Sequence, residues 1–100
     1  MDRLTTSING IRIRLPDERW QHITQRHADM LGQEELILAV IASPERVLAG
    51  KSGELMAIRE FEPEKWLVVI YREEQNDGFI ITAFPTRRIN SLNQRTQLWP

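Results

Sequence analysis

Cysteine is absent from this chain of 100 residues, and histidine occurs only at His22 and His27. Disulfides, thiolate-bound zinc, iron–sulfur clusters and cysteine nucleophiles are therefore excluded, and so is a metal centre built from three histidines. The two histidines are five residues apart, a spacing that suits a shared metal site on a helix poorly. We therefore expect no metal and no cofactor.

Long apolar runs are also lacking. No run approaches the ~20 residues that a membrane-spanning helix requires, and the first seven residues, MDRLTTS, lack the apolar core of a signal peptide. We expect a protein without a membrane partner and with a cytoplasmic location.

A large excess of one charge is missing as well. The net charge is −1, and glycine and proline contribute five residues each, so the composition is that of a globular protein. We expect one domain over residues 1–100, with a core over about 11–88 and a polar tail at 89–100. The tail either folds back on the core or is mobile.

The charge is nevertheless unevenly distributed. Residues 1–16 carry three arginines and one aspartate, residues 84–100 carry three arginines and no acid, and residues 17–64 are acidic. If the two ends of the chain lie side by side, they form a cationic strip of the kind that positions phosphate groups.

Helical signals occupy the first half of the chain. Asn9-Gly10 predicts a turn, and the alternation in residues 11–15 predicts a short strand. Pro16 followed by acids opens a helix that Gly32 closes. A second helix follows over about 33–42, and Ser43-Pro44 ends it.

The second half of the chain changes to a strand pattern. Strands are predicted over 46–49, 54–61, 66–72 and 79–84, separated by turns that include Asp77-Gly78. The expected fold is α+β, with two N-terminal helices packed on one face of a four-stranded antiparallel sheet.

His27 is the first candidate for chemistry. It shares a helical face with Trp20 and Ile23, which places it at the edge of the helix–sheet contact. A half-buried imidazole with a pKa near neutrality is the usual general acid or base. The alternative is a histidine that is hydrogen-bonded at the rim of the core, whereas His22 is expected on the surface.

Arg59 is the second candidate, because it alternates with Leu55, Ala57 and Phe61 on an otherwise apolar strand face. A cation there needs an anion, either a structural carboxylate or a phosphate. The segment after the last strand offers a hydroxyl and two cations, Thr86, Arg87 and Arg88, although solubility alone would also explain the two arginines.

Further candidates lie on the last two strands. Thr82 is in the middle of the final strand, where threonine is also common for structural reasons. Tyr71 and Arg72 end the preceding strand and are expected to project near residues 86–88. Gly50-Lys51-Ser52-Gly53 contains Gly-Lys-Ser, but it lacks the glycine spacing and strand-to-helix context of a P-loop and is interpreted as a hairpin tip.

Two segments carry a resemblance to a known family. They are Trp20-Gln21-His22-Ile23-Thr24-Gln25-Arg26-His27-Ala28-Asp29 and Ile80-Ile81-Thr82-Ala83-Phe84-Pro85-Thr86. With the elements between them, they resemble the small phage-associated domains of the barnase–EndoU–colicin–RelE nuclease superfamily over roughly residues 11–88. Asp29 and Ala28 depart from the glutamate and proline that are frequent in that family, and the chain is less basic than RelE-like toxins.

The resemblance implies a metal-independent endoribonuclease, with an antitoxin as a possible protein partner. Matched by position, it assigns His27 as the histidine, Arg59 as the strand cation and Thr82 or Thr86 as the hydroxyl. The substrate's 2′-hydroxyl would attack the adjacent phosphorus, leaving a 2′,3′-cyclic phosphate. Tyr71, Arg72, Arg87 and Arg88 are the substrate-binding candidates.

Two other functions remain open from the sequence. The near-neutral charge also suits a non-catalytic module that binds protein or RNA, with the acidic middle of the chain and the apolar Leu98 and Trp99 as contacts. A small-molecule or metal-dependent enzyme is the third possibility, although the chain is poor in metal ligands.

Overall fold

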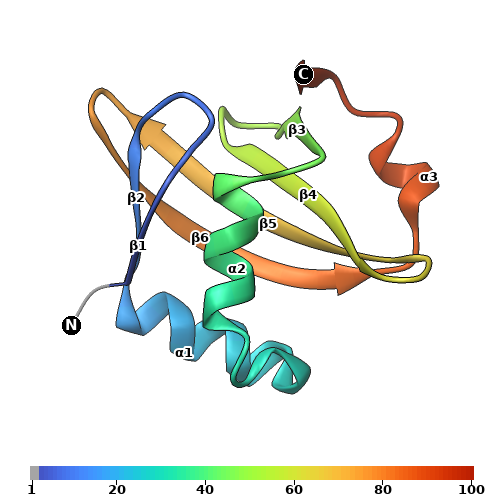
Figure 1. The fold of residues 1–100 in the computed structure, drawn as a ribbon, viewed down its shortest axis with the longest axis horizontal. Helices are drawn as coiled ribbons and strands as arrows, with labels where there is room; N and C mark the ends of the chain where they lie inside the picture. The colour runs from blue at the N-terminus through green and yellow to red at the C-terminus, as the bar shows by residue number, and fades with distance from the viewer. Residues whose placement is uncertain (1–2) are drawn as a thin grey trace.

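A computed structural model describes residues 3–100 as one seven-stranded mixed sheet with short helices on both faces. The order of strands across the sheet is β1-β2-β6-β5-β4-β3-β7. Figure 1 shows α2 crossing in front of the sheet, α1 below it and α3 to one side. The strands are β1 (Arg3–Thr6), β2 (Arg12–Leu15), β3 (Arg46–Ala49), β4 (Leu55–Glu62), β5 (Lys65–Glu74), β6 (Asp77–Thr86) and β7 (Gln97–Trp99). The helices are α1 (Asp17–Arg26), a 3₁₀ turn η1 (Ala28–Met30), α2 (Glu34–Ala42) and α3 (Ile89–Leu92).

The expected fold class is wrong. The sheet has seven strands rather than four, it is mixed rather than antiparallel, and a helix lies on each face. The four strands from residue 46 to residue 86 do pair antiparallel in chain order, as their turn signals predict. Outside them, the hairpin β1–β2 joins the edge of β6 through a parallel β2–β6 ladder, and β7 adds to the other edge along β3.

Two hydrophobic clusters explain why both faces are covered. Successive residues of a strand point to opposite faces, and the central strands are apolar on both. On one face, residues such as Ala57, Val69 and Ala83 pack with α1 and α2. On the other face, Leu48, Met56 and Val68 pack against Leu92 of α3. We call these the α2 face and the α3 face.

The segment at 89–100, expected as a polar tail, therefore contains structural elements. Leu92 is only 6% exposed, and Ile89 packs against the same cluster. The helix that covers the second face is α3. It has only four residues, too few to show a helical pattern in the sequence. None of the helices in the described part of the chain has the length and apolar character to cross a membrane.

The first helix is shorter than predicted. It ends at Arg26, and His27 is its C-cap with φ −135° and ψ 81°, so His27 has left the helical conformation. Gly32, with φ +78°, instead ends the 3₁₀ turn and the loop that precede α2. The break turns the chain at His27 and decides where its imidazole lies.

Candidate functional site

The exposed part of the α3 face is hollowed by three neighbouring cavities, which we call the sheet groove. Two of these cavities share Ile81 and two share Arg14, so the three follow one another across the sheet. Ile81 is the extra residue of a β-bulge, where the register shifts between Ile70 and Tyr71. Bulges bend a strand and re-aim its side chains, and this one lies where the first two cavities meet.

The cavity beside Thr82 has a volume of about 380 Å³. Its floor is apolar, formed by Met56, Ile70 and Phe84, and its polar groups are at the rim. A largely apolar hollow with a few polar groups is typical of binding sites. The remaining lining residues are Gly50, Lys51, Glu54, Ile81, Thr82 and Arg95.

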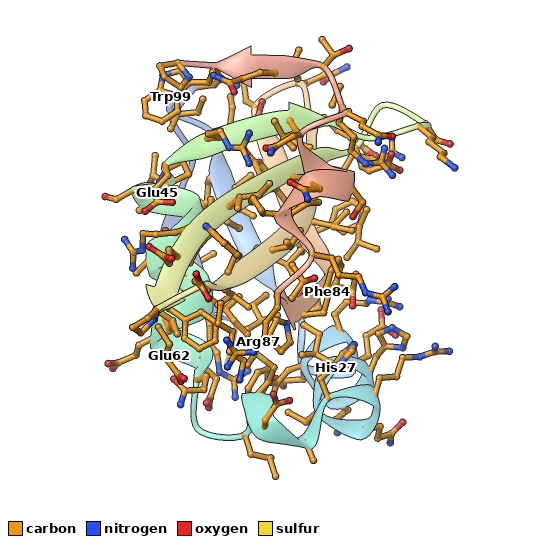
Figure 2. The ribbon with its side chains drawn as sticks, turned by 90° about the vertical axis from the view of Figure 1, so that its right-hand side faces the viewer. His27, Glu45, Glu62, Phe84, Arg87 and Trp99 are labelled. Carbon is orange, nitrogen blue, oxygen red and sulfur yellow. The ribbon has the colours of Figure 1, made fainter. Side chains whose placement is uncertain are left out.

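His27 does not line this cavity but contacts Phe84, which does. Its imidazole ring is 6.2 Å from the ring of Phe84, centroid to centroid, and tilted by 34°. Phe84 and Thr82 are two residues apart on β6 and therefore point to the same face. Figure 2 shows His27 below Phe84, at the end of α1. Phe84 thus links the two candidates, since it contacts His27 and lines the same cavity as Thr82.

Thr86, Arg87 and Arg88 follow along the same end of β6. The Thr86 hydroxyl accepts a hydrogen bond from the Arg88 backbone N–H at 3.0 Å. The Arg87 guanidinium donates to the carbonyl oxygens of Pro63 and Glu64 at 3.4 and 3.5 Å. Arg87 lines a separate cavity of about 220 Å³, whose other lining residues are Glu64, Trp66 and Ile89. These residues neighbour the sheet groove but do not line it.

Arg59 is not part of this arrangement. It is paired with Leu67, which is paired in turn with Pro85, so Arg59 lies on the α2 face. Its guanidinium donates a 3.1 Å hydrogen bond to the carbonyl oxygen of Ser43, the C-cap of α2. The cation thus satisfies an open carbonyl at a helix C-terminus, and the sheet separates it from Phe84.

Tyr71 and Arg72 are also away from His27. Tyr71 is fully buried in the α2-face cluster, and no hydrogen-bond partner of its hydroxyl is found among the described residues. Burial, and then the neighbouring Glu73 carboxylate, raise the pKa of Tyr71 above its ordinary range. Arg72 donates to the Ser52 carbonyl at 3.1 Å and lies 3.8 Å from the Glu54 carboxylate, so it holds the β3–β4 turn against β5.

Sequence reasoning missed the cations that line the groove. Lys51 and Arg95 border the cavity of Thr82, and neither forms an ion pair with another residue in the range 3–100. Arg14 and Arg19 border the next cavity. The signal was the basic character of the two chain ends. These ends lie at opposite edges of the sheet, but Arg14 and Arg95 project to the same face.

The other histidine has a distinct environment. Partial burial, followed by the charges of Arg19, Arg26 and His27, lowers the pKa of His22 below its usual 6.5. Within residues 3–100, no group of three His, Asp or Glu side chains lies close enough together to hold a metal ion. Comparison with protein-family models, with curated proteins and with solved structures gives no match for this chain.

Proposed function

We propose that this protein binds single-stranded RNA in the sheet groove and cleaves it without a metal ion. The observation that carries the proposal is the placement of His27 against Phe84, beside the cavity that holds Thr82 and Arg95. An imidazole, a hydroxyl and a cation around an aromatic surface are the groups needed to bind a nucleotide and transfer its proton. The resemblance of residues 20–29 and 80–86 to phage-associated nucleases supports the same function.

The proposed reaction needs one proton acceptor and one cation. His27 removes the proton from the 2′-hydroxyl, whose oxygen attacks the adjacent phosphorus. The bond from phosphorus to the 5′ oxygen then breaks, and the protonated His27 returns the proton to that oxygen. The products are a 2′,3′-cyclic phosphate and a free 5′-hydroxyl, so the histidine is regenerated.

Arg95 takes the role that the resemblance assigns to Arg59. Its guanidinium borders the cavity of Thr82 and can stabilise the negative charge that develops on the phosphorane oxygens. The Thr82 hydroxyl orients one of those oxygens. Phe84 offers a face on which a base stacks, an interaction worth about 1–3 kcal/mol per base.

The experiment is a cleavage assay on a labelled single-stranded RNA in the presence of EDTA. We expect wild-type protein to yield 2′,3′-cyclic phosphate ends and His27→Ala to be slower by about 100-fold or more. His22→Ala is the matched control, since His22 lies on α1, the helix that His27 caps, and is not placed in the site. Equal rates for wild type and His27→Ala, or loss of cleavage in EDTA, would refute the proposal.

A protein-binding module is the second candidate. Leu98 and Trp99 on the edge strand β7 are 53% and 36% exposed, and an exposed apolar edge favours pairing with another chain. Expression of this protein alone in a host distinguishes the two functions. A ribonuclease slows the growth of a host that makes it alone, whereas a binding module does not.

A further inference from the structure

The sheet groove continues well beyond the groups proposed for cleavage. From the cavity of Thr82 it passes Ile81 into a cavity of about 490 Å³, and from there it passes Arg14 into a third cavity of about 580 Å³. The third cavity lies at the far edge of the sheet, over β1 and β2, and includes Leu4 and Arg12. Chemistry at His27 alone requires none of this length.

We propose that the second and third cavities form an extended track for a single nucleic-acid strand. The strand would cross β6, β2 and β1 away from the cleavage site. The proposal deepens the function given above and rests on it for the nature of the ligand. It assigns Arg12, Arg14 and Arg19 to the phosphates of nucleotides that are not cleaved, and Phe79 to a base.

Register places these side chains on one face. Arg14 of β2 is paired with Phe79 of β6, which is paired in turn with Arg72 of β5, so the three side chains lie on the same face. Arg12 is two residues from Arg14 and projects to the same side. Ile13 and Leu15 point the other way and are fully buried in the α2-face cluster. The alternation in β2 therefore turns its apolar residues inward and both of its arginines toward the groove.

The charge of the groove favours a polyanion. Five cations and three carboxylates line the three cavities, whereas the chain as a whole has a net charge of −1. Arg14 and Asp77 pair with each other at 3.2 Å, and Glu54 lies 3.8 Å from Arg72. Four cations and one carboxylate of the groove are therefore without an ion pair among residues 3–100. The cations are Arg12, Arg14, Arg19, Lys51 and Arg95, and the carboxylates are Glu18, Glu54 and Asp77.

The dimensions favour a strand over a mononucleotide. Neighbouring strands are about 4.8 Å apart, so the distance across the sheet from β4 to β1 is roughly 19 Å. That distance is enough for on the order of four nucleotides, the lower end of the site sizes of folds that bind single strands. A rigid duplex would instead contact the rims, because α1 forms one wall through the 2.8 Å hydrogen bond from Arg19 Nε to the Ile81 carbonyl.

Binding is best measured on strands that cannot be cleaved. Fluorescein-labelled 2′-O-methyl oligouridylates of two, four and eight nucleotides lack the attacking hydroxyl, so fluorescence anisotropy reports affinity alone. For the wild-type protein we expect the affinity to rise steeply from two to four nucleotides. For Arg12→Gln/Arg14→Gln we expect the tetramer to bind about tenfold more weakly, and the salt slope to fall by about 1.4. Arg59→Gln, on the other face, is the matched control and should bind like wild type.

The results separate the track from the cleavage centre. If affinity does not depend on length, if the double arginine variant binds like wild type, or if a duplex competes equally well, the track is refuted. Cleavage of a dinucleotide by the double variant at the wild-type rate, with weaker binding of longer strands, supports it. Length-dependent binding by a protein that cleaves nothing would support the track and refute the catalytic proposal.

Discussion

At the residue scale, the buried hydroxyl of Tyr71 and the half-buried imidazole of His22 allow predictions about stability that do not depend on the proposed function. The Tyr71 hydroxyl is buried with no partner found among residues 3–100. A buried group without a hydrogen bond costs about 1–3 kcal/mol. We expect Tyr71→Phe to keep the fold and to leave the free energy of unfolding unchanged or about 1 kcal/mol higher, measured by urea denaturation. A loss of more than about 1 kcal/mol would show that the hydroxyl has a partner.

His22 predicts a pH dependence with a defined sign. Its pKa is lowered in the folded protein, chiefly by partial burial and then by Arg19 and other cations, so the unfolded chain binds the proton more tightly. Stability is therefore full above the ordinary pKa of 6.5 and falls as the pH drops below it. We expect the melting temperature of His22→Gln to decline less between pH 7 and pH 5 than that of wild type. NMR titration of His22 above 6.5 would contradict this.

Residue patterns predicted which side chains share one side of a strand or helix better than they predicted what those side chains contact. The alternation around Arg59 correctly indicates a cation among apolar side chains, but it cannot tell which of two apolar faces that is. Trp20 and Ile23 do lie on one helix, but the helix ends at Arg26, so His27 does not continue their helical face. His27 lies near Phe84 because the chain turns there, and no periodicity in the sequence encodes that contact.

At the scale of elements, Arg59 links β4 to the end of α2. Removing its guanidinium leaves the Ser43 carbonyl without this 3.1 Å bond. We expect Arg59→Ala to lower the free energy of unfolding by about 1–2 kcal/mol and to leave RNA cleavage unchanged, measured by urea denaturation and by the cleavage assay on the same preparation. A large loss of cleavage with unchanged stability would return Arg59 to the catalytic centre.

Gly78 marks the junction where β6 meets both β2 and β5. A Cβ there would overlap with the Arg72 carbonyl oxygen and lie 2.6 Å from a methyl group of Ile13. Backbone cannot move aside easily, so we expect Gly78→Ala to destabilise the protein by about 1–3 kcal/mol. The exposed neighbour Asn76→Ala is the control and should change stability by less than about 0.5 kcal/mol. A neutral Gly78→Ala would mean that this ladder is looser than described.

The elements that the sequence predicts well are those with local signals. The turn at Gly50–Gly53 marks one central hairpin, and proline marks the start of α1 and the end of α2. The next hairpin is also where the sequence predicts it, but its turn consists of Gln75 and Asn76, and Asp77 and Gly78 already belong to β6. The edge strands β1 and β7 have three or four residues with no apolar alternation, and backbone pairing with a neighbour creates them. The parallel β2–β6 ladder joins residues more than sixty positions apart, beyond the reach of any local pattern.

At the scale of the whole molecule, the two-sided core makes the C-terminal segment part of the fold. Leu92 is 6% exposed and packs with Leu48, Met56 and Val68, a cluster that α3 covers. We expect Leu92→Ala to lower the free energy of unfolding by about 2–3 kcal/mol, since truncating a buried leucine removes apolar contacts and leaves a cavity. Urea denaturation measures this, and Leu98→Ala is the matched control because Leu98 is 53% exposed.

The same pair of variants separates a structural tail from a binding tail. If α3 is needed to close the α3 face, Leu92→Ala also exposes apolar surface and binds a hydrophobic dye, while Leu98→Ala does neither. Because α3 leads directly to Arg95 at the cavity of Thr82, loosening it also displaces the proposed phosphate-stabilising cation. Leu92→Ala should therefore slow RNA cleavage at a temperature where the protein remains folded. If Leu92→Ala has the stability and the activity of wild type, the packing of α3 on the sheet contributes to neither.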